Sequence, residues 1–259
     1  MYSVHCCYNQ SLMNGVLETK QEGRVLRVWL NRAEARNLLT SQLCRELIQA
    51  LDGAEKDGSV GAVLLAGRGD CFCAGMDFSD LARGDVEKVG RLQETLFTVG
   101  ARLTKPLIAA VQGPALGGGT GVVANCHVVI ASQNATFGVT GIRMGLWPFV
   151  FFHAVSAAMG ERRALALTIT GEILDAAEAL RIGLVHQVVP NEEVESRAVE
   201  LAETVANYSS NTLRSGLGFV NALQGQPWKA AASAGRLLRD EFFKSAEFQA
   251  NLKAMLNQK

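Results

Sequence analysis

The sequence predicts an α/β fold that is followed by a helical C-terminal unit. Two observations support this fold class. Between residues 24 and 131, short apolar segments alternate with glycine-rich loops and helical patterns, and from about residue 191 onward only helical spacing remains. Alternation of strands, loops and helices is typical of α/β cores. We therefore expect a core at residues 1–190, of which 1–14 form a lead-in, and a helical region at residues 191–259.

The elements follow from local patterns in chain order. Residues 24–30 alternate weakly, as a strand does, and Ser41 is a candidate cap for a helix with apolar residues at helical spacing. Glycines bound the apolar run 61–67, which is typical of a buried strand, and a helix is expected at 87–104. The remaining expected elements are a strand at 107–111, a helix at 122–126, a strand at 127–131, and helices at 192–208, 228–243 and 246–256.

Composition excludes several classes of protein. The 259 residues include 25 Lys+Arg and 25 Asp+Glu, so the net charge is zero and a nucleic-acid partner is not expected. Hydrophobic residues make up 48% of the chain, which fits a globular protein with a sizeable core. The most apolar stretch, residues 145–159, is too short to span a membrane, and no signal peptide is expected. Six cysteines without metal or redox spacing indicate reduced thiols and a cytoplasmic location.

Two glycine-rich segments each follow an apolar strand. Residues 71–77 read Cys-Phe-Cys-Ala-Gly-Met-Asp, and residues 115–119 read Ala-Leu-Gly-Gly-Gly. Glycine lets a backbone turn sharply and approach a ligand, and amides at such turns attract negative charge. Two amides aimed at one point would form an oxyanion hole. A tight turn without chemical function is the simpler interpretation of either segment alone, and neither has nucleotide-binding spacing.

Together with four further segments, these loops resemble the enoyl-CoA hydratase/isomerase (crotonase) family. The six segments that carry the resemblance are 31–37, 72–77, 105–119, 135–138, 176–185 and 188–190. The resemblance implies a crotonase-type spiral of ββα units with a C-terminal helical trimerisation region. It also implies an acyl-CoA thioester as ligand and a homotrimer or dimer of trimers. No separate cofactor is implied, because coenzyme A is part of the substrate.

The resemblance assigns roles to particular residues. The backbone amides of Met76 and Gly118 would form the oxyanion hole and act in catalysis. The residues that would lie along the adenine and pantetheine of CoA are Ala33, Ala35, Ala74, Asp77 and Phe78. A local cap is the simpler interpretation of Asp77, and a surface charge is the simpler interpretation of Arg36.

Two positions depart from the family pattern. A family hydratase carries one glutamate two residues after the G-G-G segment and another after A-x-F-G, and here these positions are Gly121 and Gly141. Because glycine has no group that transfers a proton, we expect slow hydration. Decarboxylation of a malonyl-type thioester fits this pattern best, because loss of CO₂ forms the enolate without a base. The alternative is a catalytically silent acyl-CoA-binding or partner subunit.

Other side chains are candidates for proton transfer. Glu94 lies near a position where some relatives carry a base, and His153 follows an apolar run that lines the acyl pocket in relatives. The alternatives are a solvent-facing Glu94 and a core His153. His127 and His186 lie in or beside predicted strands and are expected to be structural. The aromatic residues at 147–152 favour core packing or a pocket for a bulky or apolar acyl group.

Overall fold

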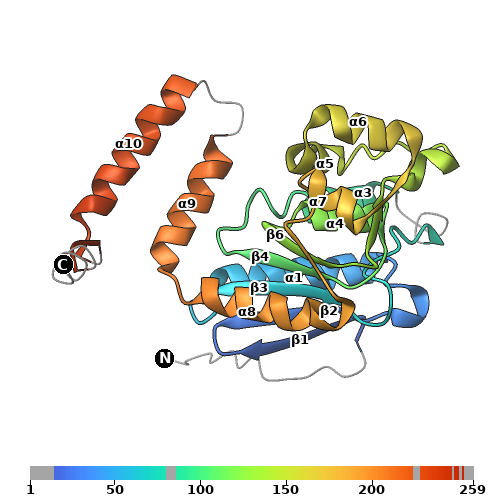
Figure 1. Ribbon diagram of the computed structural model, residues 1–259, viewed down its shortest axis with the longest axis horizontal. Coiled ribbons are helices and arrows are strands. Elements are labelled where there is room, and N and C mark those ends of the chain that lie inside the picture. The colour runs from blue at the N-terminus through green and yellow to red at the C-terminus, as the bar shows by residue number, and fades with distance from the viewer. Residues whose placement is uncertain (1–14, 80–85, 224–227, 247, 251–252, 254–259) are drawn as a thin grey trace.

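A computed structural model describes residues 15–79, 86–223, 228–246, 248–250 and 253. The lead-in predicted for 1–14 and part of the helix predicted for 246–256 lie outside the described residues. The chain forms an α/β core, and two helices, α9 (Ser210–Ala222) and α10 (Trp228–Lys244), stand away from it (Figure 1). Within the described ranges, no helix is both long and apolar enough to cross a bilayer.

A six-stranded sheet forms the centre of the core, in the order β1-β2-β3-β4-β6-β9. The strands are β1 (Leu17–Glu22), β2 (Val25–Leu30), β3 (Ala62–Gly67), β4 (Leu107–Val111), β6 (Val128–Ser132) and β9 (Gln187–Val189). β1 runs antiparallel to β2, and the other neighbouring pairs are parallel. The two apolar runs noted in the sequence are the central strands β3 and β4, which are buried almost throughout. These two strand predictions are confirmed.

A smaller sheet, in the order β5-β7-β8, carries the second glycine-rich segment. Its strands are β5 (Ala115–Leu116), β7 (Thr136–Gly138) and β8 (Ile173–Asp175). The helices of the core are α1 (Ser41–Lys56), α3 (Val86–Phe97), α4 (Gly118–Ala124), α5 (Phe152–Met159), α6 (Glu161–Thr170), α7 (Ala176–Arg181) and α8 (Val194–Ala206). Short 3₁₀ helices are η1 (Ala33–Ala35), η2 (Thr140–Met144) and η3 (Asn191–Glu193).

Three predicted helix boundaries are wrong. The cap of α1 is Thr40 rather than Ser41, because the Thr40 hydroxyl accepts a hydrogen bond from the Leu43 amide at 3.1 Å. α3 ends at Phe97, and the chain turns before β4 instead of continuing to residue 104. α4 begins at Gly118, inside the glycine run and four residues before the predicted start. Its tight burial overrides the low helix propensity of glycine.

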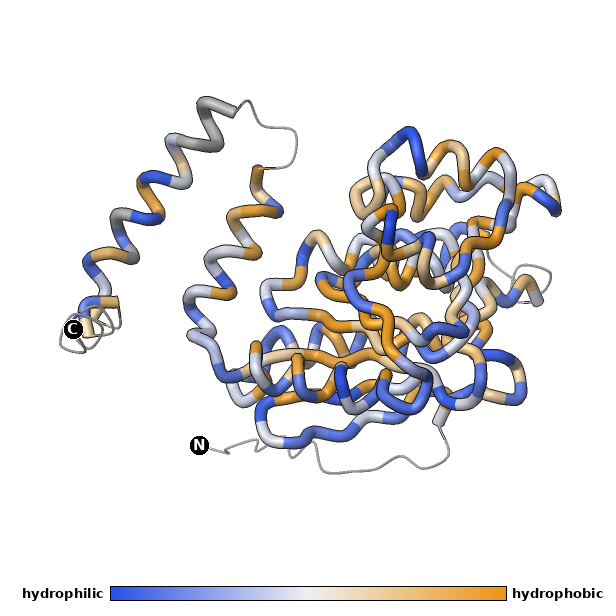
Figure 2. Tube along the Cα trace, viewed as in Figure 1, coloured by the Kyte–Doolittle hydropathy of each residue, from blue (hydrophilic) through white to orange (hydrophobic). Residues whose placement is uncertain are grey.

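Apolar layers cover both faces of the large sheet. α8 lies on one face and buries Val194, Ala198, Ala202 and Ala206 against β2, β3, β4 and β6. α1 covers the other face as part of the larger core cluster. Figure 2 shows hydrophobic residues concentrated along the strands between these layers. α8 lies beyond the predicted domain boundary at residue 191, yet it packs on the sheet of the core. The division into residues 1–190 and 191–259 stays a prediction.

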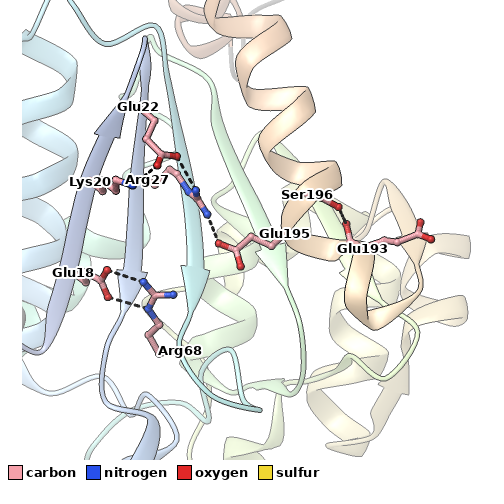
Figure 3. A network of polar contacts seen from close by, with 8 residues as sticks. All are labelled: Glu18, Lys20, Glu22, Arg27, Arg68, Glu193, Glu195 and Ser196. Atoms are coloured by element: carbon pink, nitrogen blue, oxygen red, sulfur yellow. Dashed lines mark hydrogen bonds and ion pairs between the residues drawn. The ribbon is translucent and has the colours of Figure 1, made fainter.

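An ion pair joins α8 to β2, and a second one joins β1 to the residue that follows β3 (Figure 3). Arg68 forms two hydrogen bonds with the carboxylate of Glu18, at 2.9 and 2.7 Å, and Arg27 binds Glu195 of α8. Both guanidinium groups lie over the ring of Trp29, with the central carbon 4.3 Å (Arg68) and 4.6 Å (Arg27) from the ring centroid. These contacts hold the strands that lead into the first glycine-rich segment.

Candidate functional site

The two glycine-rich segments lie side by side and are hydrogen-bonded to each other. The Cys73 amide donates to the Pro114 carbonyl at 3.1 Å, and the Leu116 amide donates to the Cys73 carbonyl at 2.9 Å. These bonds form a parallel bridge between Cys73 and Ala115. The segments follow the neighbouring parallel strands β3 and β4. Both therefore leave the sheet at the carboxyl ends of its strands, where α/β proteins commonly bind ligands.

Neighbouring hydrogen bonds set the direction of the Met76 amide. The Leu39 amide donates to the Gly75 carbonyl at 2.8 Å, and the Leu39 carbonyl accepts from the Asp77 amide at 3.1 Å. In this parallel pattern the N–H of Met76 itself points away from Leu39. Gly118 opens α4, so its N–H has no intrahelical acceptor. Among the described residues neither amide has an acceptor, and both residues line one cavity.

Glycine is required where the two loops approach each other. Gly75 has a φ of 117°, and a Cβ there would lie 3.1 Å from the Leu116 carbonyl oxygen and 3.6 Å from the Gly118 nitrogen. A Cβ on Gly119 would lie 2.2 Å from the carbonyl oxygen of Cys73. Side chains at either position would push the loops apart, so glycine preserves the approach of the two amides.

The cavity has a volume of about 280 Å³. Its apolar lining side chains are Ala74, Met76, Phe78, Val139, Met144, Leu146, Trp147, Pro148, Val150 and Phe151. Gln93 and Thr140 add an amide and a hydroxyl group, and no described lining side chain carries a charge. The arrangement can hold an apolar group and place negative charge at two amides. A larger hollow of about 410 Å³ lies at α9 and α10 and includes neither loop.

Gly121 and Gly141 have different surroundings. A Cβ on Gly121 would lie 2.9 Å from Cβ and Cγ of Phe151 and 2.9 Å from a ring carbon of Phe97. The two aromatic rings pack together with centroids 5.1 Å apart, and they fill the space that a side chain at residue 121 would need. Gly141 lines the cavity, and a Cβ there would lie 3.2 Å from the Leu146 carbonyl oxygen. A side chain at residue 121 would therefore have no free space, whereas a side chain at residue 141 would have a little space beside the cavity.

The predicted acid–base side chains lie outside the cavity. Glu94 and His153 are both exposed, and neither is part of the lining. The α3 residue that lines the cavity is Gln93, which directly precedes Glu94. The geometry thus gives no support to proton transfer by Glu94 or His153, and these roles stay predictions. Of the aromatic run, Trp147 and Phe151 line the cavity, as the pocket interpretation required.

The residues predicted to contact CoA lie beside the first loop. Ala33 and Ala35 are the ends of η1, and Arg36 directly follows this helix. The amide of Ala74 donates a hydrogen bond to the Arg36 carbonyl at 3.0 Å. Ala74 and Phe78 line the cavity, and Phe78 is 42% exposed. Ala33 is exposed and Ala35 is half-buried. The CoA contacts themselves stay predictions.

Asp77 makes local contacts, in agreement with its interpretation as a cap. Its carboxylate accepts a hydrogen bond from the Ser79 hydroxyl at 2.6 Å and from the Ser79 amide at 3.1 Å. Arg32 lies 3.6 Å away. The hydrogen bond from Ser79, together with Arg32, lowers the pKa of Asp77, so the carboxylate is ionised near neutral pH. Asp77 does not line the cavity of about 280 Å³.

Asn37 fixes the loops beneath the site, and the sequence did not single it out. Its fully buried side chain donates to the carbonyls of Arg68 at 2.9 Å and Cys71 at 2.7 Å, and it accepts from the Arg32 amide at 2.8 Å. Its φ of 53° lies in the left-handed region, which asparagine tolerates better than most residues. An asparagine in a polar stretch looks solvated, so no sequence signal marks its burial.

Comparisons with known proteins agree with this geometry. The family model described as enoyl-CoA hydratase/isomerase matches residues 20–259. A short-chain-enoyl-CoA hydratase of Clostridium acetobutylicum is 38% identical over 201 residues, which are 76% of each chain. The 2,3-dehydroadipyl-CoA hydratase of Escherichia coli is 34% identical over 206 residues, 78% of this chain and 80% of that protein.

A solved structure shows the same architecture. The crystal structure of an enoyl-CoA hydratase from Mycobacterium smegmatis has a TM-score of 0.88 and 26% identity, and the match covers 94% of this chain and 97% of that one. The protein thus has the α/β crotonase-type fold that the sequence predicted. The chain belongs to the enoyl-CoA hydratase/isomerase family.

Proposed function

We propose that the protein binds an acyl-CoA thioester with the thioester oxygen between the amides of Met76 and Gly118. The observation that carries this proposal is that two amides without an acceptor in the described chain belong to residues of interlocked loops that line one apolar cavity. Relatives named for enoyl-CoA and 2,3-dehydroadipyl-CoA support a thioester as the ligand. Each preorganised donor contributes about 3–4 kcal/mol where negative charge develops on such an oxygen.

The reaction we infer does not need a carboxylate of the protein. Addition of water across a double bond requires groups that give and take protons, and the described cavity lining has no ionisable side chain. In a malonyl-type thioester, the bond between the α-carbon and the carboxylate breaks, and CO₂ leaves. The electron pair stays on the substrate as an enolate whose oxygen the two amides hold. Transfer of a proton from water to the α-carbon then gives the acyl-CoA and hydroxide.

The apolar lining favours this step for an electrostatic reason. A substrate carboxylate loses hydration when it enters a cavity without a cationic partner, so its ground state is raised. In the transition state the charge moves toward the thioester oxygen, where Met76 and Gly118 offer hydrogen bonds. An interaction that strengthens between the ground state and the transition state accelerates the reaction.

The same lining favours a second candidate function. Because no described side chain in the cavity can transfer a proton, the site also suits a subunit that binds acyl-CoA without turnover. The two candidates predict equal binding and differ only in product formation. Measurement of CO₂ release from malonyl-CoA and methylmalonyl-CoA separates them.

The experiment compares Gly118→Pro with Gly118→Ala. Proline suits the first position of a helix, so it removes the donor N–H without demanding a new backbone angle. Alanine adds the same Cβ and keeps the N–H, and in both variants this atom meets the flexible end of Met76 at 3.1 Å. We expect turnover to fall about 10²–10³-fold in the proline variant and only a few-fold in the alanine variant. If calorimetry detects no acyl-CoA binding to the unaltered protein at millimolar ligand, the proposal fails.

We also propose that α9 and α10 pack against further copies in a homotrimer or dimer of trimers. Both helices stand away from the core (Figure 1). They expose apolar side chains, including Val220 at 59% and Phe243 at 45% exposure. Exposed apolar surface of this kind is costly in water and is usually covered. Light scattering at micromolar concentration tests the assembly, and a monomer would contradict it.

A further inference from the structure

Gln93 and Thr140 are the two described residues that bring an amide and a hydroxyl group to the wall of the cavity. Gln93 comes from α3 and Thr140 from η2, so the two groups enter from separate elements. The remaining walls, apart from the indole of Trp147, offer aliphatic, aromatic and thioether groups or backbone. A small number of placed polar groups in an apolar pocket usually fixes the orientation of a ligand.

Neither side chain is engaged within the described protein. No hydrogen bond joins the Gln93 carboxamide or the Thr140 hydroxyl to another described group, and both residues are half-buried. Thr120, in contrast, lies nearby in α4 and is satisfied, since its hydroxyl donates to the Ala115 carbonyl at 2.6 Å and accepts from the Gly138 amide at 3.1 Å. The hydroxyl of Thr120 is therefore used in hydrogen bonds within the fold, whereas the polar groups of Gln93 and Thr140 can form hydrogen bonds with a ligand.

Gln93 also lies close to the loop that carries the first amide. It lies at the packed junction of α3 with the first loop, together with Met76, Asp77 and Leu39. Because Met76 and Gln93 also line the same compact cavity of about 280 Å³, a group that meets the carboxamide lies within that cavity's span of the Met76 amide. A substituent that reaches Gln93 must then be near the thioester end of the acyl group, rather than at a distant chain end.

We propose that Gln93 and Thr140 select acyl groups that carry an oxygen-bearing substituent, a hydroxyl, carbonyl or carboxylate, close to the thioester. This inference rests on the proposed acyl-CoA site. An acyl chain that displaces water without hydrogen-bonding groups leaves the carboxamide and hydroxyl unpaired, which is unfavourable in an enclosed site. An oxygen on the substrate restores these bonds. Both protein groups are neutral, so they orient a carboxylate without the strong ground-state attraction of a guanidinium group.

The test compares three thioesters of one chain length by calorimetry: butyryl-CoA, 3-hydroxybutyryl-CoA and acetoacetyl-CoA. The protein should bind the two oxygen-bearing ligands more tightly than butyryl-CoA. Gln93→Leu and Thr140→Val replace each polar group with an apolar one of similar size, and each should weaken the oxygen-bearing ligands about two- to tenfold. Butyryl-CoA should bind these variants equally well or more tightly. Thr140→Ser keeps the hydroxyl and should retain the preference.

Two controls keep the outcome clear. Gln133→Leu makes the same chemical change at an exposed residue outside the cavity, and it should alter none of the three affinities. Thermal unfolding confirms that each variant is folded. Equal weakening of all three ligands in Gln93→Leu, or no preference in the unaltered protein, overturns the inference while the acyl-CoA site stands. If none of the three ligands binds the unaltered protein, the proposed function fails and this inference fails with it.

Discussion

His127 and Leu107 exchange two hydrogen bonds across the start of neighbouring strands. The Leu107 amide donates to Nδ1 of the His127 ring at 2.9 Å, and the His127 amide donates to the Leu107 carbonyl at 2.8 Å. His186 and Val129 repeat the arrangement one strand further along, at 3.1 and 2.9 Å. Each imidazole must be neutral at Nδ1 to accept its bond, and burial lowers the pKa of both histidines.

Stability should therefore depend on pH in one direction. In the unfolded chain these histidines bind protons near pH 6.5, whereas the folded state binds them only at lower pH. The free energy of unfolding should be constant above about pH 7 and should fall as the pH drops below about 6.5. Urea unfolding at a series of pH values measures this dependence. His127→Asn keeps an acceptor and cannot titrate, so it should flatten part of the curve, and the share of His186 should remain.

A glutamate at residue 121 should destabilise the protein. Its side chain would enter the space that Phe97 and Phe151 fill, and overpacking of a core costs about 1–3 kcal/mol before the cost of the buried charge. Gly141→Glu should cost less, because residue 141 lines the cavity. Urea unfolding of both variants checks the order. Phe151→Ala should recover part of the loss in the Gly121→Glu protein, and equal stability of the two glutamate variants would contradict the packing seen here.

Hydration of crotonyl-CoA should be slow. Each acid–base group contributes about 10²–10⁴-fold, so the absence of both corresponds to roughly 5–11 kcal/mol if the effects are independent. The effects act on one water molecule and are coupled, so the observed loss should be smaller than their sum. Loss of the enoyl-thioester absorbance measures the rate. Turnover within tenfold of an ordinary hydratase would show that other residues replace the carboxylates.

The four described cysteines should react slowly with thiol reagents. Cys44, Cys71, Cys73 and Cys126 are buried. Burial raises the pKa of Cys73 and of Cys126 to about 12, so almost no thiolate is present near neutral pH. In a protein with serine at residues 6 and 7, a disulfide reagent should label these thiols rapidly only after urea is added. Rapid labelling of the native protein would show that the core opens locally.

Much of the fold was predictable because the central strands are read from continuous apolar runs. Residues 62–67 and 107–111 are buried on both faces, so nothing polar interrupts them. The helix start at Gly118 was not predictable, since glycine is a poor helix former and only its packing against the first loop makes the conformation favourable. Sequence patterns report local preference, and this helix is set by a contact across 40 residues or so.

The site was predictable as two loops and not as a cavity. The closure of residue 121 depends on Phe151, which lies far along the chain, and no spacing rule links the two. The choice between Gln93 and Glu94 depends on helical phase, because adjacent residues differ by about 100° around a helix. The apolar stripe of α3 gives this phase only approximately, and the structure shows that Gln93 faces the cavity.

The bridge between Cys73 and Ala115 has a consequence for the order of events during refolding. The two amides come from segments that follow β3 and β4, so pairing of these strands in register brings the segments together. The chain between the two segments is a long loop. The entropic cost of closing it must be met before the contacts between the segments can stabilise the closed state. During refolding, affinity for a thioester should consequently return after the helical circular dichroism signal has recovered. The site then serves as its own reporter of completed folding, since no fragment that ends between the two segments can form it.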